Sequence, residues 1–279
     1  MGLRRIGQID MTMSPKKRTI ILCISAIALL LPLIPLLMWS FVTFWRWPTI
    51  VPQFDGGYWV ELIADQKLLP ALKNSLILSS LVTFLSLALS IFAAKNLGTR
   101  LFRGKRLIEF ALLIPMFIPQ IAVVFGMQSV FIKLGLYSNF VGLLIAHLVF
   151  YVPYATLLLT AVFENYDISI EYQARTLGVG CIKTMLFVTL PAVRSGVIVT
   201  GVFCFIGSWS VYLLNNIIGH PHFKTLPTLI FPLVSVGNNS YSTMAVAIII
   251  YILPILAIVI FSSKALSDTQ AAVRKGGIV

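Results

Sequence analysis

Long runs of apolar residues, separated by short polar or charged segments, fill most of the chain. Six runs are long enough to cross the roughly 30 Å hydrocarbon core of a bilayer, which takes about 20 residues of α-helix. They cover residues 19–43, 74–95, 108–130, 140–163, 192–214 and 241–263. The pattern therefore predicts an all-α membrane protein with six transmembrane helices. An even number of crossings places both termini on the same side.

The first run could be mistaken for a secretory signal, because the basic residues 16–18 directly precede it. It is longer than the apolar region of a signal peptide, and no small-residue cleavage site follows it. We therefore interpret it as an uncleaved first helix. The expected organisation is a tail over residues 1–18, one six-helix transmembrane domain over 19–263 and a second tail over 264–279.

The composition agrees with a membrane protein, since 58% of the residues are hydrophobic and only 11% are charged. A typical soluble domain has about 25% charged residues. The net charge of +12 comes from Lys and Arg that flank the apolar runs, so it indicates orientation in a bilayer, and no nucleic-acid partner is expected. Sixteen of the 21 Lys and Arg lie on the side of the termini, which predicts that both termini are cytoplasmic.

One connecting segment, residues 164–194, is too polar at its start to cross a membrane and nearly neutral overall. Local signals predict two short helices in it. Asp167 or Ser169 can cap the first helix, and Gly178 and Gly180 can break it. The apolar stretch 181–188 then forms the second helix.

Three residues of this segment are spaced so that they share one face of the first helix: Glu171, Ala174 and Gly178. Two of them are small, which would let the surface of another protein approach the backbone closely. An amphipathic connector that lies on the membrane surface is the alternative interpretation of the same pattern.

The stretch Glu-Tyr-Gln-Ala at 171–174, followed by Gly178 and by Leu190-Pro191, resembles the EAA loop of ABC importer permeases. In that family Glu-Ala-Ala is followed after three residues by Gly, and later by Leu-Pro. The spacing from Gly178 to Pro191 matches, and so does the place of the segment before the fifth apolar run. The departures from the family pattern are Tyr172, Gln173 and Val179.

This resemblance implies the architecture of a type I ABC importer permease in a bacterial inner membrane. It implies three kinds of partner: a dimer of cytosolic ATP-binding-cassette ATPases, a second permease subunit that is either identical or homologous, and an extracytoplasmic solute-binding protein. The loop, residues 164–191 here, would transmit the ATPase cycle to the membrane helices. The implied ATPase-coupling residues are Glu171, Ala174, Gly178, Leu190 and Pro191.

The chain itself is not expected to be an enzyme or to need a cofactor. Residues 98–106 superficially resemble a phosphate loop, but the glycines are one residue too far apart, and Arg106 follows Lys105 in place of Ser or Thr. A secondary transporter driven by an ion gradient is the alternative, and it would require an inverted repeat and intramembrane acids. A membrane enzyme would require a cluster of His, Asp or Ser at membrane depth.

Polar residues within the apolar runs are candidates for a solute route. Pro115 and Pro119 interrupt the third run and predict a bend. His147 in the fourth run either has a functional role or forms a hydrogen bond to a neighbouring helix. The candidate residues for the route are Gln120, Gln128, Ser208 and Trp209.

The expected solute is a polyamine. The chain resembles permeases grouped with polyamine, ferric-iron, thiamine and phosphonate importers, and the predicted outer acids Asp55, Glu61 and Asp65 would suit a cation. No metal site is predicted, because the histidines at 220 and 222 have no acidic or thiol neighbours.

Overall fold

The computed structural model describes most of the chain, and α-helices account for nearly all of its regular structure. The described residues are 15–44, 51–219, 222–235 and 241–276. Most of the predicted 1–18 tail and the last residues of the 264–279 tail therefore lie outside the described part. The chain divides into two compact units, residues 1–62 with 238–249, and residues 63–237 with 250–279.

The first unit contains a short β-hairpin between helices. Its elements are α2 (Pro15–Leu30), α3 (Leu33–Trp39), β1 (Val42–Phe44), β2 (Gln53–Phe54), most of α4 (Gly57–Ala64) and the start of α14 (Tyr241–Gly276). β1 and β2 pair antiparallel, with Val42 opposite Phe54. The hydroxyl of Ser242 donates a hydrogen bond to the carbonyl of Val42, which ties the start of α14 to the hairpin.

The apolar run that we predicted as one helix over residues 19–43 is broken in the structure. α2 has 16 residues and α3 has 7, with a turn at 31–32 between them. Pro32 has no N–H to donate to the preceding turn, which explains the interruption. β1 then takes the end of the run. Neither helix alone has the length of a membrane crossing, so the first crossing stays a prediction.

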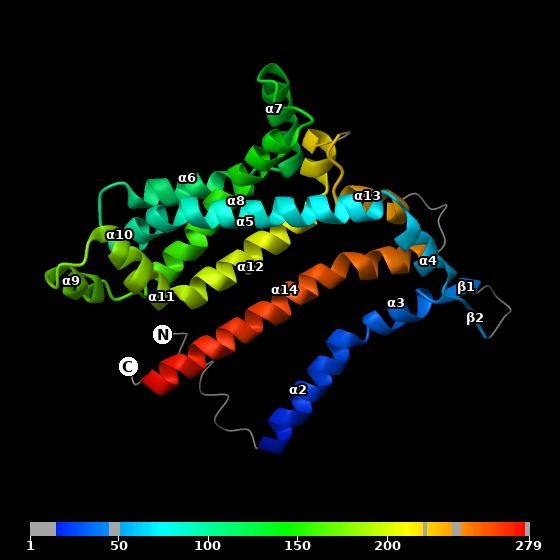
Figure 1. Cartoon of the computed structure of the whole chain (residues 1–279), viewed down its shortest axis with the longest axis horizontal. Coiled ribbons are helices and arrows are strands. Elements are labelled where there is room, and N and C mark those ends of the chain that lie inside the picture. Colours follow the sequence, from blue (N-terminus) through cyan, green and yellow to red (C-terminus); the bar gives the residue numbers. More distant parts are fainter. Residues whose placement is uncertain (1–14, 45–50, 220–221, 236–240, 277–279) are drawn as a thin grey trace. The chain divides into compact units, whose positions relative to one another are not determined.

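The second unit is built around the long helix α5 (Leu68–Thr99), which packs against α8 (Phe140–Phe163) and α12 (Arg194–Ser210) (Figure 1). Its other helices are α6 (Lys105–Phe117), α7 (Gln120–Lys133), α9 (Ser169–Thr176), α10 (Cys181–Thr184), the π-helix η1 (Met185–Thr189), α11 (Leu190–Ala192), the π-helix η2 (Asn215–Gly219), α13 (Leu226–Ser235) and the end of α14.

Small residues allow α5 and α8 to approach closely. Gly98 lies so near α8 that a Cβ atom there would stand 2.5 Å from the Cβ of Phe163. The hydroxyl of Ser90 donates to the carbonyl of Val152 at 2.9 Å. Close backbone approach with interhelical hydrogen bonds is how membrane helices associate, because lipid offers no hydrophobic driving force between them.

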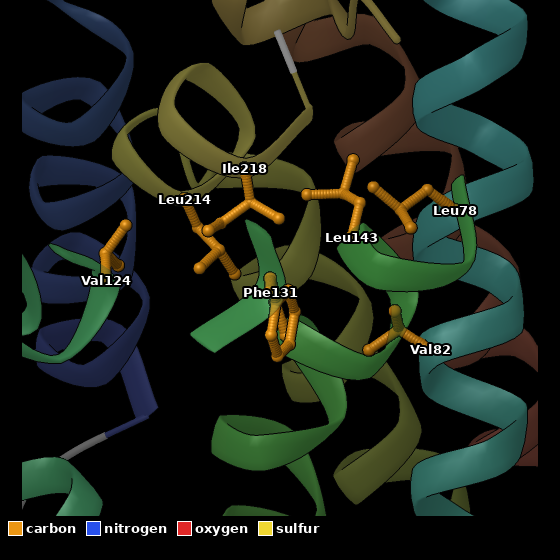
Figure 2. Close-up of a cluster of buried hydrophobic side chains, with 8 residues drawn as sticks. Leu78, Val82, Val124, Phe131, Leu143, Leu214 and Ile218 are labelled. Carbon is orange, nitrogen blue, oxygen red and sulfur yellow. The ribbon is translucent and has the colours of Figure 1, made fainter. Parts of the chain in front are cut away.

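An apolar cluster joins α5, α7, α8 and η2 (Figure 2). Its buried side chains are Leu78, Val82, Val124, Phe131, Leu143, Ala146, Leu214 and Ile218. Large apolar side chains also cover the outer face of α5, where Phe84 and Phe92 are exposed. A helix that is apolar on its packed face and on its exposed face is typical of a membrane span.

Three described helices are long and apolar enough to cross a membrane, and two bent pairs would raise the number to five. The three single helices are α5, α8 and residues 241–267 of α14. The predicted span 108–130 is a bent pair, because α6 and α7 meet at 93°, and α10–α11 meet α12 at 79°. Of the six predicted spans, the described residues thus show three as single long helices and two as bent pairs, and the number of crossings stays a prediction.

The bend between α6 and α7 has a local cause in the sequence. Ile118 is extended, with φ −74° and ψ 134°, and Pro119 follows it. A residue before proline is disfavoured in the α region, and proline cannot donate to the preceding turn. The prolines at 115 and 119 therefore predicted the bend correctly, but not its size.

Candidate functional site

The loop 164–191 has the two short helices that its sequence predicts. The carboxylate of Asp167 accepts hydrogen bonds from the backbone N–H of Ser169 at 2.9 Å and from its hydroxyl at 2.8 Å. These bonds lower the pKa of Asp167 and order the turn before α9. Gly178 ends the helix with φ +85°, a left-handed conformation that favours glycine.

The side chain of Glu171 is buried and joins three elements at one point. Lys95 Nζ at the end of α5 lies 2.6 Å from Glu171 Oε2. The hydroxyl of Thr189 in η1 donates to Oε1, also at 2.6 Å. We call Lys95, Glu171 and Thr189 the loop cluster. Burial raises the pKa of the Glu171 carboxyl, but the bonds from Lys95 and Thr189 outweigh it, so the pKa lies below its ordinary value.

The position of Glu171 corrects one expectation. We expected Glu171, Ala174 and Gly178 to share a face turned toward another protein, but the structure turns Glu171 inward, leaves Ala174 half-buried and exposes only Gly178. The carboxylate is thus taken up by this chain's own Lys95 and Thr189. The exposed apolar side chains of the loop are others: Ile170, Tyr172, Leu177, Ile182, Leu186 and Phe187.

The end of the loop leads into α12 through a π-helix that the sequence did not predict. Leu190 is half-buried against an apolar cluster that includes Phe163 and Met185, whereas Pro191 is exposed in the first turn of α11. Because Pro191 has no N–H, the carbonyl of Phe187 lacks its usual helical donor, which favours widening of the preceding turn.

A cavity of about 480 Å³ lies where the α6–α7 break meets α8 and α12. Of the four residues predicted for a solute route, Gln120 lines this cavity, and Gln128 does not. Sequence reasoning missed its aromatic side chains, although the dense run of aromatics at 150–154 was a visible signal. The lining residues are Pro115, Met116, Phe117, Ile118, Pro119, Gln120, Phe150, Tyr151, Tyr154, Phe203, Gly207, Val211 and Leu214.

Ser208 and Trp209, the other two predicted route residues, are buried and are not among the residues that line the cavity. The indole of Trp209 stacks on Phe205 with ring centroids 5.8 Å apart and contacts Tyr251 at 6.0 Å. Trp209 therefore does not line this cavity, and its place on the solute route stays a prediction. The side chain of Ser208 takes part in a buried polar network instead.

That network bears on the two interpretations left open for His147. His147 Nε2 lies 2.8 Å from Asn215 Oδ1, and Nδ1 lies 3.0 Å from Ser208 Oγ. We call His147, Ser208 and Asn215 the helix cluster. The intramembrane histidine thus bonds to neighbouring helical segments, as one of the two interpretations held. Asn215 was not predicted, although it lies seven residues after Ser208, a spacing that can place both on one helical face.

Comparison with known proteins identifies the family. Residues 86–269 match the binding-protein-dependent transport system inner membrane component. The chain belongs to this family. It is therefore an ABC importer permease and a multi-pass membrane protein, as the EAA-like loop implied.

Individual relatives are distant but match over most of their length. The sulfoquinovosyl glycerol permease SmoH of Agrobacterium fabrum is 25% identical over 78% of this chain and 77% of its own. The spermidine/putrescine permease PotC of Escherichia coli is 25% identical over 74% of this chain and 78% of its own length. These two names refer to different kinds of solute.

Solved structures support the fold. A chain of a bacterial ABC transporter that imports alginate matches with a TM-score of 0.71, at 18% identity, over 95% of this chain and 98% of that one. A second structure of a bacterial alginate ABC transporter, in complex with an alginate pentasaccharide-bound periplasmic protein, matches with a TM-score of 0.62, again at 18% identity, over 88% of this chain and 92% of that one.

Proposed function

We propose that this permease forms the route for a small solute and that its 164–191 loop couples the route to separate ATPase subunits. The observation that carries the proposal is the loop cluster. It fixes α9 and η1 to the end of α5, so a force applied to the loop reaches the helix around which the second unit is built. ATP hydrolysis then belongs to the partner chains.

The surface offered to the ATPase consists of the exposed apolar side chains of the loop. Leu177, next to the left-handed Gly178, is 84% exposed, and Tyr172 and Ile182 of the same loop are exposed as well. A cluster of exposed apolar side chains on a polar connecting loop is typical of a protein–protein contact. Glu171 acts from inside the loop, and Ala174, Gly178, Leu190 and Pro191 set the backbone path of this surface.

We propose six crossings in a bacterial inner membrane. The concentration of Lys and Arg on the side of the loop indicates that both termini are cytoplasmic. The remaining partners follow from the family. A second permease subunit would complete the route. An extracytoplasmic binding protein would deliver the solute, as the alginate relative solved with its periplasmic protein suggests.

We keep a polyamine as the proposed solute. PotC among the relatives supports it, and the rings of Tyr151 and Tyr154 in the cavity can hold ammonium groups through cation–π contacts. Uptake of radiolabelled spermidine by vesicles that contain the assembled transporter is the direct measurement. Uptake of a sugar glycoside with no uptake of spermidine would contradict this choice of solute.

The coupling assignment is tested by Leu177→Asp. This exposed side chain has little packing to lose, so the protein should insert normally, while the ATPase should copurify with it about tenfold less, as the loss of an apolar contact at an interface centre predicts. Leu101→Asp is the matched control, because Leu101 is 97% exposed in the other predicted cytoplasmic connection. Equal copurification of both variants would refute the docking surface.

A further inference from the structure

The helix cluster spans a break in α12. The helix ends at Ser210, Val211 is extended with φ −74° and ψ 112°, and η2 begins at Asn215. Ser208 lies before this break and Asn215 lies after it, while His147 reaches both from α8. All three side chains are at most 1% exposed. One imidazole ring therefore holds the two sides of the break together.

The chemistry of the partners fixes where the protons lie. The carbonyl of Val211 can only accept, so Asn215 Nδ2 donates to it, and Oδ1 of the same amide faces the histidine. Oδ1 also only accepts, so His147 Nε2 must carry a proton. In a neutral ring Nδ1 is then the acceptor, and the Ser208 hydroxyl donates to it.

The same residues are interleaved with the lining of the cavity. Gly207, Val211 and Leu214 line it, and Ser208 and Asn215 are their direct neighbours in the chain. Tyr151, one turn after His147, stacks on the imidazole with ring centroids 5.9 Å apart and an interplanar angle of 22°. Tyr151 also lies against α12, since a Cβ on Gly207 would stand 2.6 Å from its Cε1.

We propose that His147 is a positioning residue of the solute route. Its neutral Nε2–H form bonds both sides of the α12 break, and this fixes Val211, Leu214 and Tyr151 as one side of the cavity. Irregular backbone at membrane depth is tolerated where it is buried in protein or lines a cavity, and this break does both. The proposal rests on the proposed function in one respect, namely that the cavity belongs to the route.

The first test reads the protonation of the ring directly. The chain has three histidines, so His220→Gln with His222→Gln leaves His147 as the sole labelled histidine. In lipid nanodiscs, ¹³C–¹⁵N correlation spectra at pH 7 should show a proton on the nitrogen bonded to Cδ2, which is Nε2, and none on Nδ1. A proton on Nδ1, or on both nitrogens, would overturn the proposal.

The second test measures the geometry of the break. Val211→Cys, in a chain without its native cysteines, places a half-buried thiol in the break, where N-ethylmaleimide labelling reports its accessibility. Adding His147→Ala should raise the labelling rate about fivefold, the scale expected when a net hydrogen bond is lost. His147→Gln should raise it less, since an amide N–H can still donate to Asn215.

The control is Ser86→Ala, which removes a buried hydroxyl that has no hydrogen-bond partner among the described residues. It should leave the labelling rate unchanged. A rate in His147→Ala equal to that in Ser86→Ala, or equal rates in His147→Gln and His147→Ala, would overturn the positioning role. Neither test involves transport, so their failure is distinct from a failure of the Leu177→Asp experiment, which would concern the importer function.

Discussion

The loop cluster and the helix cluster both bury polar atoms where three elements meet, but they use different chemistry. The loop cluster is an ion pair with a hydroxyl, and its Lys95 side chain is still 18% exposed. The helix cluster consists of neutral groups that are almost completely buried. An unscreened charge is far more costly than a neutral hydrogen-bonding group in a low-dielectric interior. The charged pair is therefore found where one partner still contacts water, and the nearly fully buried cluster consists of neutral groups.

The two clusters also differ in what they hold. The loop cluster fixes an exposed loop to the end of a long helix, and it depends on one strong attraction between a carboxylate and an ammonium. The helix cluster fixes the geometry of a broken helix through hydrogen bonds. These bonds depend on orientation, because each donor N–H or O–H must point at its one acceptor atom. The comparison predicts that the loop cluster contributes more free energy than the helix cluster, and that its contribution is lost in acid because it depends on an ionised carboxylate.

Removing the carboxylate should have the largest effect. Glu171→Ala leaves the ammonium of Lys95 beside a vacated, poorly hydrated site, and the free energy of unfolding should fall by about 3 kcal/mol. Unfolding of the purified chain in mixed micelles, titrated with sodium dodecyl sulfate and followed by tryptophan fluorescence, measures the change.

A matched double variant separates charge from packing in the same experiment. Lys95→Met combined with Glu171→Met replaces the pair by apolar side chains of similar length, which often restores stability. The double variant should recover most of the loss, to within about 1 kcal/mol of the original protein. If the single and the double variants lose the same amount, the ion pair is not what stabilises the loop.

A smaller loss is expected from the helix cluster. Ser208→Ala leaves His147 Nδ1 without its donor, and hydrogen bonds between membrane helices contribute about 1 kcal/mol each. The same measurement on Ser86→Ala should show almost no change, because that hydroxyl has no partner to lose among the described residues. A loss in Ser208→Ala equal to or larger than that in Glu171→Ala would reverse the order that the comparison predicts.

Local features of the fold could be predicted from the sequence because their causes are local. Asp167 orders the start of α9 and Gly178 ends it, as the spacing indicated. The prolines near 119 predicted a bend, but its angle of 93° depends on the packing of α6 and α7, which no local pattern encodes. The break in the first apolar run also has a local cause, Pro32, but the prediction missed it because the length and hydropathy of the run were given more weight than the proline.

The candidate site was only partly predictable, because its contacts join distant parts of the chain. Glu171 was identified by its motif, but its partner Lys95 lies 76 residues earlier, and only the packed structure shows that the carboxylate faces inward. Trp209 packs on Phe205 and does not line the cavity, which the sequence could not show, because it does not distinguish the lining side of a helix from its packed side. Its place on the route stays a prediction. Gln120 lines the cavity, but its role in transport remains a prediction.

The smallest expected effect is the pH dependence of the loop cluster, since protonation removes the charge of Glu171 but leaves the side chain in place. Its pKa in the folded protein lies below the ordinary value of 4.5. The stabilisation is therefore fully present above about pH 4.5 and is lost as the pH falls through the folded pKa, because the unfolded chain binds the proton first.

The difference in unfolding free energy between the original protein and Glu171→Gln should be constant from pH 7 to pH 5 and should shrink below 4.5. A Glu171→Gln difference that is equally constant below pH 4.5 would mean that the ionised carboxylate does not stabilise the folded loop.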